Sequence, residues 1–315
     1  MTRWIRSSTG RLALLGLLVL LIVDVGLVAL AFRHDPVGSG PATQAQTPVP
    51  APQSTPVAST PTVAPGPEAH PVPLQQVVVG LDASRAWRAV LGTCDKGGAS
   101  IEVTGDGGRT WQARKAPAKA LGRVQPVSAD RAFVIGADAS CSAGEYITAD
   151  GAGTWDGPRE LQGAWSRTPG GASSTAVTPD RAGARPCGSG TLLDLARVSG
   201  TSARALCADG SVTTSTDGGA TWTGLAKVTG ALALSVRDEK GTSRVYVARV
   251  GQGCAGVEVA RVSEGSSTQV ACVPVPDALP EGQVSLSAVG KAGWLSVGDA
   301  TYRAGADLRT WTAAG

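Results

Sequence analysis

Hydrophobic and polar residues follow three different patterns along the chain. Residues 12–32 form one long apolar run, residues 33–75 are rich in proline and small polar residues, and residues 76–315 hold short apolar runs separated by glycine-rich turns. One long run predicts a membrane-spanning helix, and many short runs predict an all-β domain. We therefore expect a cytoplasmic basic tail (1–11), a transmembrane signal-anchor helix (12–32), a disordered stalk (33–75) and one extracytoplasmic domain (76–315).

The apolar run at 12–32 has the length of a bilayer-spanning helix. It contains 21 residues with one charge, Asp24, and three arginines precede it. About 20 apolar residues cross the hydrocarbon core, and the positive-inside rule keeps the arginine-rich end in the cytoplasm. The alternative is a cleavable signal peptide, because residues 29–31 read Ala-Leu-Ala, although the apolar regions of signal peptides are usually shorter. Both readings export the domain, and we expect the anchor to be retained in the cell membrane.

The stalk has the composition of a spacer. Residues 35–73 contain 11 of the 20 prolines and almost no charge. Proline fixes φ and removes backbone donors, so such a segment favours solvated polyproline II. At about 3.1 Å per residue, it would reach on the order of 100 Å when extended.

An eight-residue motif recurs in the domain at 76–315. In its three clear copies, aspartate lies five residues before tryptophan and threonine lies directly before it. The copies are TGDGGRTW (104–111), TADGAGTW (148–155) and STDGGATW (215–222), followed by the weaker VSEGSSTQ (262–269) and AGADLRTW (304–311). The tryptophan positions are 44, 67, 47 and 42 residues apart. Repeats of about 40–50 residues predict the four-stranded blades of a β-propeller.

Each repeat also has an aromatic-centred strand upstream of the motif. Four such aromatic residues are expected in the core, namely Trp87, Phe133, Tyr246 and Trp294. Each unit then consists of strands A to D, with the motif between strands C and D. We expect five four-stranded blades. A six-bladed ring is the alternative, because about 20 additional residues lie between the second and third motifs.

These repeats resemble the Asp-box (BNR) family, whose β-propellers include the sialidases and many non-enzymatic secreted proteins. The resemblance covers most of residues 75–315 and implies that the boxes lie on the face opposite the ligand site. It also implies a structural role for the box residues, in which aspartate accepts hydrogen bonds from the turn and tryptophan covers the hairpin. These residues are Asp106, Trp111, Asp150, Trp155, Asp217, Trp222, Asp307 and Trp311.

The six cysteines predict disulfides in place of a metal site. All lie in the exported domain, none forms a C-x-x-C pair, and both histidines (His34 and His70) precede the domain. We therefore expect no metal and no cofactor. Alignment of the repeats predicts Cys94–Cys141, because the two occupy the same loop of adjacent blades. It also predicts Cys187–Cys207 and Cys254–Cys272, which lie close together within their units.

A ligand site is expected where the strand B–C loops and the connections between blades share one face. Residues 156–190 form a long connection on that face, and long loops in compact domains often bind ligands. Trp165 in this connection is the candidate aromatic contact. The alternative is that Trp165 packs against its own blade.

Charge and site chemistry narrow the possible functions. Beyond residue 75 the chain has 24 basic and 22 acidic residues and no long basic run, which argues against nucleic-acid binding. The sialidase Phe-Arg-Ile-Pro motif is absent, Tyr146 and its neighbour Glu145 point to opposite faces of a strand, and Tyr246 and Tyr302 have no obvious carboxylate partner.

The leading hypothesis is a membrane-tethered module that binds or assembles a protein or glycan of the cell envelope. A sialidase-like glycoside hydrolase is one alternative, so the sequence does not decide whether the protein is an enzyme. An assembly factor for a membrane complex is another. For that role Asp24 would be the discriminating residue, because an acidic side chain in a membrane helix can mark a partner helix, although it can also cross without a function.

Overall fold

The computed structural model describes residues 69–314 with the exception of 171–172 and 276–277. The tail expected at 1–11, the helix expected at 12–32 and most of the stalk expected at 33–75 lie outside these residues. All regular elements within the described part are β-strands. These residues include no helix that is long and apolar enough to cross a membrane.

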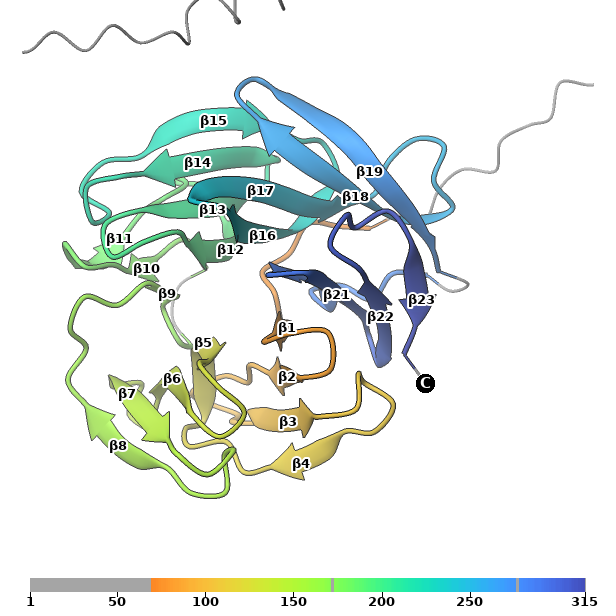
Figure 1. The fold of residues 1–315 in the computed structure, drawn as a ribbon. Helices are drawn as coiled ribbons and strands as arrows, with labels where there is room; N and C mark the ends of the chain where they lie inside the picture. Colours follow the sequence, from red (N-terminus) through yellow and green to blue (C-terminus); the bar gives the residue numbers. More distant parts are fainter. Residues whose placement is uncertain (1–68, 171–172, 276–277, 315) are drawn as a thin grey trace, which may run out of the picture. The chain divides into compact units, whose positions relative to one another are not determined.

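The described strands form six antiparallel sheets arranged as the blades of a β-propeller (Figure 1). The first two blades are β1 (Gln76–Gly80), β2 (Ala86–Val90), β3 (Ser100–Thr104), β4 (Gln112–Arg114), and β5 (Ala120–Pro126), β6 (Ala132–Ala137), β7 (Ala143–Thr148), β8 (Asp156–Arg159). The third and fourth are β9 (Ser166–Arg167), β10 (Ala176–Val177), β11 (Ala182–Ala184), and β12 (Leu192–Arg197), β13 (Ala203–Cys207), β14 (Ser211–Ser215), β15 (Thr223–Lys227). The last two are β16 (Ala231–Glu239), β17 (Thr242–Arg249), β18 (Gly256–Ser263), β19 (Ser266–Pro274), and β20 (Val284–Val289), β21 (Ala292–Val297), β22 (Ala300–Ala304), β23 (Trp311–Ala313).

The expectation of five blades is therefore wrong, and the six-bladed alternative is correct. The connection expected at 156–190 contains β8, which completes the second blade, and the whole of the third blade. This blade has three strands of only two or three residues each. Strands that short do not produce a recognisable alternation of apolar and polar positions, so the pattern of the sequence resembles a loop.

The innermost strand of the third blade runs in the opposite direction to its neighbour β12. Just before β9, the Trp165 indole donates to Gly200 O at 3.0 Å, in the turn that follows β12. After β9, Leu192 N at the start of β12 donates to Ser173 O at 2.8 Å. β9 to β11 thus match strands B to D of the other blades in direction, and the described residues of this blade include no hydrogen-bonded strand A before them.

The inner strands of neighbouring blades are joined by side chains. Ser285 and Ser287 on β20 accept hydrogen bonds of 3.0 Å from Val78 N and Gly80 N on β1. In the same way, Ser235 accepts from Ala288 N, and Asp194 Oδ2 accepts from Leu234 N, both at 2.8 Å. Strands that diverge from the channel cannot form a ladder across blades, and buried amides need acceptors. The serine hydroxyls and the Asp194 carboxylate in these otherwise apolar inner strands supply the acceptors.

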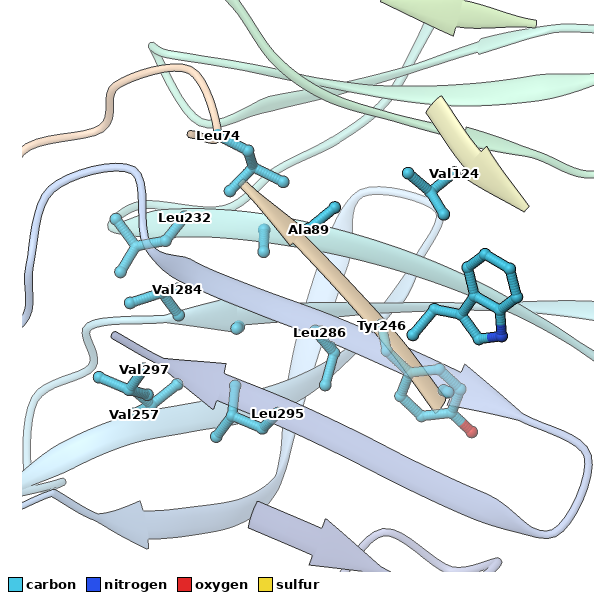
Figure 2. Close-up of a cluster of buried hydrophobic side chains, with 14 of the residues drawn as sticks. Leu74, Ala89, Val124, Leu232, Tyr246, Val257, Val284, Leu286, Leu295 and Val297 are labelled. Carbon is cyan, nitrogen blue, oxygen red and sulfur yellow. The ribbon is translucent and has the colours of Figure 1, made fainter. Parts of the chain in front are cut away.

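The core lies between the blades. Figure 2 shows Leu74, Ala89, Leu232, Leu286 and Leu295 in one cluster, and these residues come from the first, fifth and sixth blades and the segment before β1. The expected core aromatics are buried at Trp87, Tyr246 and Trp294, which are 3%, 5% and 0% exposed. Phe133 is only half-buried, with the Arg123 guanidinium 5.2 Å from its ring centroid.

Candidate functional site

The three clear motif copies form the same hydrogen-bonded turn between the third and fourth strands of their blades. In the first, Asp106 accepts from Thr110 N at 3.0 Å, Thr110 Oγ1 at 2.7 Å and Thr104 Oγ1 at 2.9 Å. The Thr104 hydroxyl in turn accepts from Gly108 N at 2.9 Å. Asp150 and Asp217 repeat this pattern. The turn at 304–311 is looser, because the described contact of the Asp307 carboxylate is Arg309 N at 3.1 Å.

These carboxylates are held in their ionised form. Hydrogen bonds from the Thr154 amide and hydroxyl lower the pKa of Asp150 to about 2. The Thr221 hydroxyl and amide lower the pKa of Asp217 to the same value. Hydrogen bonds that favour the charged form explain both shifts. A carboxylate of this kind is not a proton donor near neutral pH, so the geometry supports a structural role for the turns.

The motif tryptophans connect neighbouring blades. Trp111 meets Trp294 edge-on with ring centroids 6.4 Å apart, and Trp155 meets Trp87 in the same way at 6.3 Å. Such edge-to-face pairs contribute roughly 0.5–1.5 kcal/mol beyond their buried area. The fourth motif tryptophan, Trp311, is half-buried and donates to Leu308 O at 2.8 Å. Trp111 and Trp155 therefore stabilise the boundaries between blades, while the hydrogen bond of Trp311 stays within its own turn.

Trp165 is not a surface contact, which corrects the binding role expected from the sequence. Its side chain is 1% exposed, its indole donates to Gly200 O, and its ring meets Trp222 edge-on at 6.0 Å. The reason is positional, because the residue precedes an inner strand and fills the boundary between the third and fourth blades. The alternative expected from the sequence, that Trp165 packs against its own blade, differs from this environment, because Gly200 and Trp222 belong to the fourth blade.

All three predicted cysteine pairs are bonded in the structure. Their Cα–Cα distances are 5.4 Å for Cys94–Cys141, 5.7 Å for Cys187–Cys207 and 5.6 Å for Cys254–Cys272. The first pair joins the β2–β3 loop of one blade to the β6–β7 loop of the next. We call the side of the propeller formed by these loops and by the connections between blades the disulfide face.

A pocket of about 500 Å³ opens on the disulfide face beside the first disulfide. Its apolar lining includes Leu91, Leu121 and Leu192, and its polar lining includes Thr93 and Thr168. Val90, which is 43% exposed, lies at its edge. The sequence indicates this face but not the pocket, because the lining comes from the first four blades and only the closed ring brings them together.

The segment before β1 crosses the channel opening on the same face. Gln75 N donates to Gly282 O of the sixth blade at 2.7 Å, and Leu74 N donates to Leu193 O of the fourth blade at 3.3 Å. Arg167 secures the crossing, because its Nη2 donates to Leu74 O at 2.9 Å and its Nη1 to Leu193 O at 3.2 Å. Leu74 itself is 5% exposed, so this segment closes one end of the channel.

The channel behind this closure is a polar cavity of about 210 Å³ lined by the inner strands. Its ionisable lining residues are Arg123, Arg167, Asp194 and Arg197. Burial raises the pKa of Asp194, while Arg167 and two backbone amides oppose that rise. Burial also lowers the pKa of Arg123 to about 10, with repulsion from Arg197 as a further cause. Arg123, Arg167 and Asp194 are half-buried, and Arg197 is exposed.

The expectation that Tyr246 lacks a carboxylate partner is wrong. Its hydroxyl donates to Glu239 Oε1 at 3.0 Å, and Arg237 bonds both groups. Burial, followed by the Glu239 hydrogen bond, raises the pKa of Tyr246. The cluster of Arg237, Glu239 and Tyr246 lies near the β16–β17 turn, away from both cavities. Arg237 also donates to Ala306 O of the next blade at 2.8 Å. Its contacts join two blades.

The described residues contain no group of three histidine, cysteine, aspartate or glutamate side chains that could hold a metal ion. Tyr146 is buried and Glu145 half-buried at adjacent positions of β7, whose side chains point to opposite faces of the blade. Tyr146 and Glu145 therefore do not form a tyrosine–carboxylate pair of the kind used in glycoside hydrolysis.

Comparisons with known proteins show resemblance at the level of the fold. No family model and no curated protein matches the sequence. Similar solved structures include a GH74 enzyme of Niastella koreensis, with 15% identity, a TM-score of 0.40 and coverage of 78% of this chain and 46% of that one. YCF48 bound to D1 peptide has 15% identity, a TM-score of 0.27 and coverage of 81% and 88%. The Aleuria aurantia lectin in complex with alpha-methyl-L-fucoside has 10% identity, a TM-score of 0.43 and coverage of 76% and 93%. This chain thus spans about half the length of the GH74 enzyme.

Proposed function

We propose that the chain is a membrane-tethered, extracytoplasmic β-propeller that binds a protein or glycan of the cell envelope. The observation that carries the proposal is the pocket of about 500 Å³ on the disulfide face. Ligand pockets commonly have volumes of about 300–1,000 Å³, with a largely apolar lining and a few polar groups. Leu91, Leu121 and Leu192 supply the apolar part, and the threonine hydroxyls supply hydrogen-bonding groups.

The surroundings of the pocket favour a preformed site. Cys94 precedes the third strand of the first blade, and its bond to Cys141 fixes this loop against the second blade. Arg167 fixes the opposite wall by binding the carbonyls of Leu74 and Leu193. Loops that are already ordered lose less conformational entropy when a ligand binds.

The repeated turns give the proposal a family context. We infer that the turns around Asp106, Asp150 and Asp217 are Asp-box repeats, supported by their shared sequence and their three matching hydrogen-bond networks. They lie at the other end of the strands from the disulfide face. A structural role for the turns and a ligand role for the disulfide face are therefore compatible.

A glycoside hydrolase has less support from the geometry. Such enzymes generally use two carboxyl groups about 5–10 Å apart on either side of the scissile bond. The pocket on the disulfide face has no acidic residue in its described lining, and the channel has Asp194 alone. Binding without turnover is the function that these residues support best.

Site-specific photo-cross-linking in the producing cells tests the proposed binding face. A photoreactive amino acid replaces Val90 at the pocket edge, and Val127, which is 62% exposed in the β5–β6 turn at the opposite end of the strands, serves as the matched control. We expect a discrete envelope adduct from position 90 and none from position 127, with the partner identified by mass spectrometry. Adducts of equal yield from both positions, or from position 127 alone, would contradict the proposal.

Membrane tethering is tested separately. We expect the full-length protein to stay in the membrane fraction after a carbonate wash and to have the intact mass of the uncleaved chain. A soluble product that begins at Phe32 would overturn the anchor. If the protein instead assembles a membrane complex through its helix, Asp24→Leu should abolish copurification of that complex while leaving the adduct from position 90.

A further inference from the structure

The central channel carries an excess of positive charge. Three arginines and one aspartate line its cavity of about 210 Å³, which gives a formal charge of +2. Arg167 and Asp194 attract each other, and both are occupied by backbone partners. The charge that remains therefore belongs to Arg123 and Arg197.

Neither of these two arginines is neutralised within the described structure. Neither takes part in an ion pair there, and Glu145, the acidic residue that attracts Arg123, lies outside the channel lining. Arg123 donates to Trp165 O at 3.0 Å and to Gln125 Oε1 at 2.6 Å. Arg197 uses only its Nε, which donates to Ser199 O at 3.0 Å. Its two terminal nitrogens remain available to a ligand.

The two guanidinium groups come from different sides of the cavity. Arg123 is on β5 and Arg197 ends β12, and these strands flank the short third blade. Since blade three contributes only the two-residue β9 to the inner ring, two like charges share the space beside it. Arg123 is half-buried in this cavity, and holding a cation away from bulk water is unfavourable unless an anion compensates it.

The cavity has one closed end and one accessible end. The crossing of Leu74 to Leu193 blocks the disulfide face. Arg197, at the far end of β12 next to the β12–β13 turn, is exposed. A ligand would therefore enter from the face of the aspartate turns, opposite the pocket proposed above.

We propose that the channel binds a tetrahedral oxyanion, a phosphate or sulfate group, between Arg123 and Arg197. Guanidinium groups form paired hydrogen bonds with such oxygens, and donors that approach from two directions match tetrahedral geometry better than a planar carboxylate. The cavity of about 210 Å³ leaves room for one such group and a few waters. This site is separate from the pocket on the disulfide face.

Isothermal titration calorimetry on the full-length protein in detergent tests this site. The probes are inorganic phosphate and inorganic sulfate, titrated at ionic strength held constant with sodium chloride. The variants are Arg197→Gln and Arg123→Gln, and the control is Arg131→Gln, which removes the same charge from an exposed position in the β5–β6 turn. We expect saturable binding of at least one anion, weakened 10-fold or more in both channel variants and unchanged within about 2-fold in the control.

Two results would overturn the assignment. One is the absence of saturable heat with both anions, and the other is an Arg197→Gln protein that folds with an unchanged melting temperature and binds as wild type. Arg197 makes one described hydrogen bond through its side chain, so this variant remains informative even if Arg123→Gln disturbs the contact with Trp165. A difference between the phosphate and sulfate arms identifies the preferred group. Cross-linking from position 90 does not depend on this outcome.

Discussion

The indole nitrogen of Trp294 donates a hydrogen bond of 2.7 Å to the carbonyl oxygen of Asp82, 212 positions earlier in the chain. This bond joins the last blade to the first. Each blade consists of consecutive strands, so among the described strands none is exchanged at the seam. Trp294 is completely buried, and Trp111 of the first blade packs edge-on against it. Side-chain packing and hydrogen bonds together close the ring.

Gly80→Ala should destabilise this seam. A Cβ at Gly80 would lie 2.4 Å from Cδ1 of Trp294, and the buried indole has little room to move. Overpacking of this kind costs about 1–3 kcal/mol in the free energy of unfolding. Gly224→Ala is the matched control, because it is also a strand glycine and a Cβ there meets no atom within 4 Å. Urea unfolding compares them, and equal midpoints would argue against tight closure at Trp294.

Asp217→Ala should lower the melting temperature by several degrees without changing the binding face. The variant removes the acceptor for Thr221 N, Thr221 Oγ1 and Ser215 Oγ. Differential scanning calorimetry measures the shift, and photo-cross-linking from position 90 well below the melting temperature measures binding. Loss of the adduct at an unchanged melting temperature would place the site on the aspartate turns instead.

Acid should weaken the propeller between about pH 4 and pH 2. The pKa of Asp150 and Asp217 is lowered from 3.8 to about 2 by threonine hydrogen bonds, so the folded state binds fewer protons than the unfolded state in this window. Their stabilisation is complete above the unfolded pKa and is lost as the pH falls through the folded one. Asp217→Asn should therefore be less stable at pH 7 and lose less stability on acidification. Parallel stability curves from pH 7 to pH 2 would contradict this assignment.

Removal of the disulfides should cost stability that rises with the logarithm of loop length. The bonds Cys94–Cys141 and Cys254–Cys272 close separations of 47 and 18 residues. The chain-entropy model gives about 4 and about 3 kcal/mol for the two losses. Paired serine variants, compared by urea unfolding, measure the difference. Non-reducing peptide mapping checks the pairing, which a Cys94–Cys272 peptide would refute.

Trp165→Ala should behave as a core substitution. The side chain is 1% exposed and contacts Trp222 across the boundary between two blades. Truncation of a buried tryptophan typically costs about 3–5 kcal/mol. The melting temperature should fall well below that of Trp155→Ala, whose parent side chain is only half-buried. A stable Trp165→Ala protein that loses its envelope adduct would restore the ligand role.

The repeat unit, the turns and the cysteine pairs could be predicted from the sequence alone. Each depends on residues that are close in the chain or occupy equivalent positions in successive repeats. Asp217 and Thr221 are four residues apart, so their motif specifies their hydrogen bonds directly. Equivalent loops of adjacent blades are neighbours in any propeller, which is why repeat alignment was sufficient to pair Cys94 with Cys141.

The blade count and both cavities were decided only by the tertiary structure. A strand as short as β9 carries no periodic signal, and its backbone partner β10 is itself only two residues long. Arg123 and Arg197 are 74 positions apart and share a cavity because the ring bends their strands around one axis. Burial of Trp165 has the same origin. The residue follows the last strand of the second blade, and the fourth blade covers it only once the ring is closed. Local sequence encodes each unit, while closure of the ring determines which side chains meet at its centre.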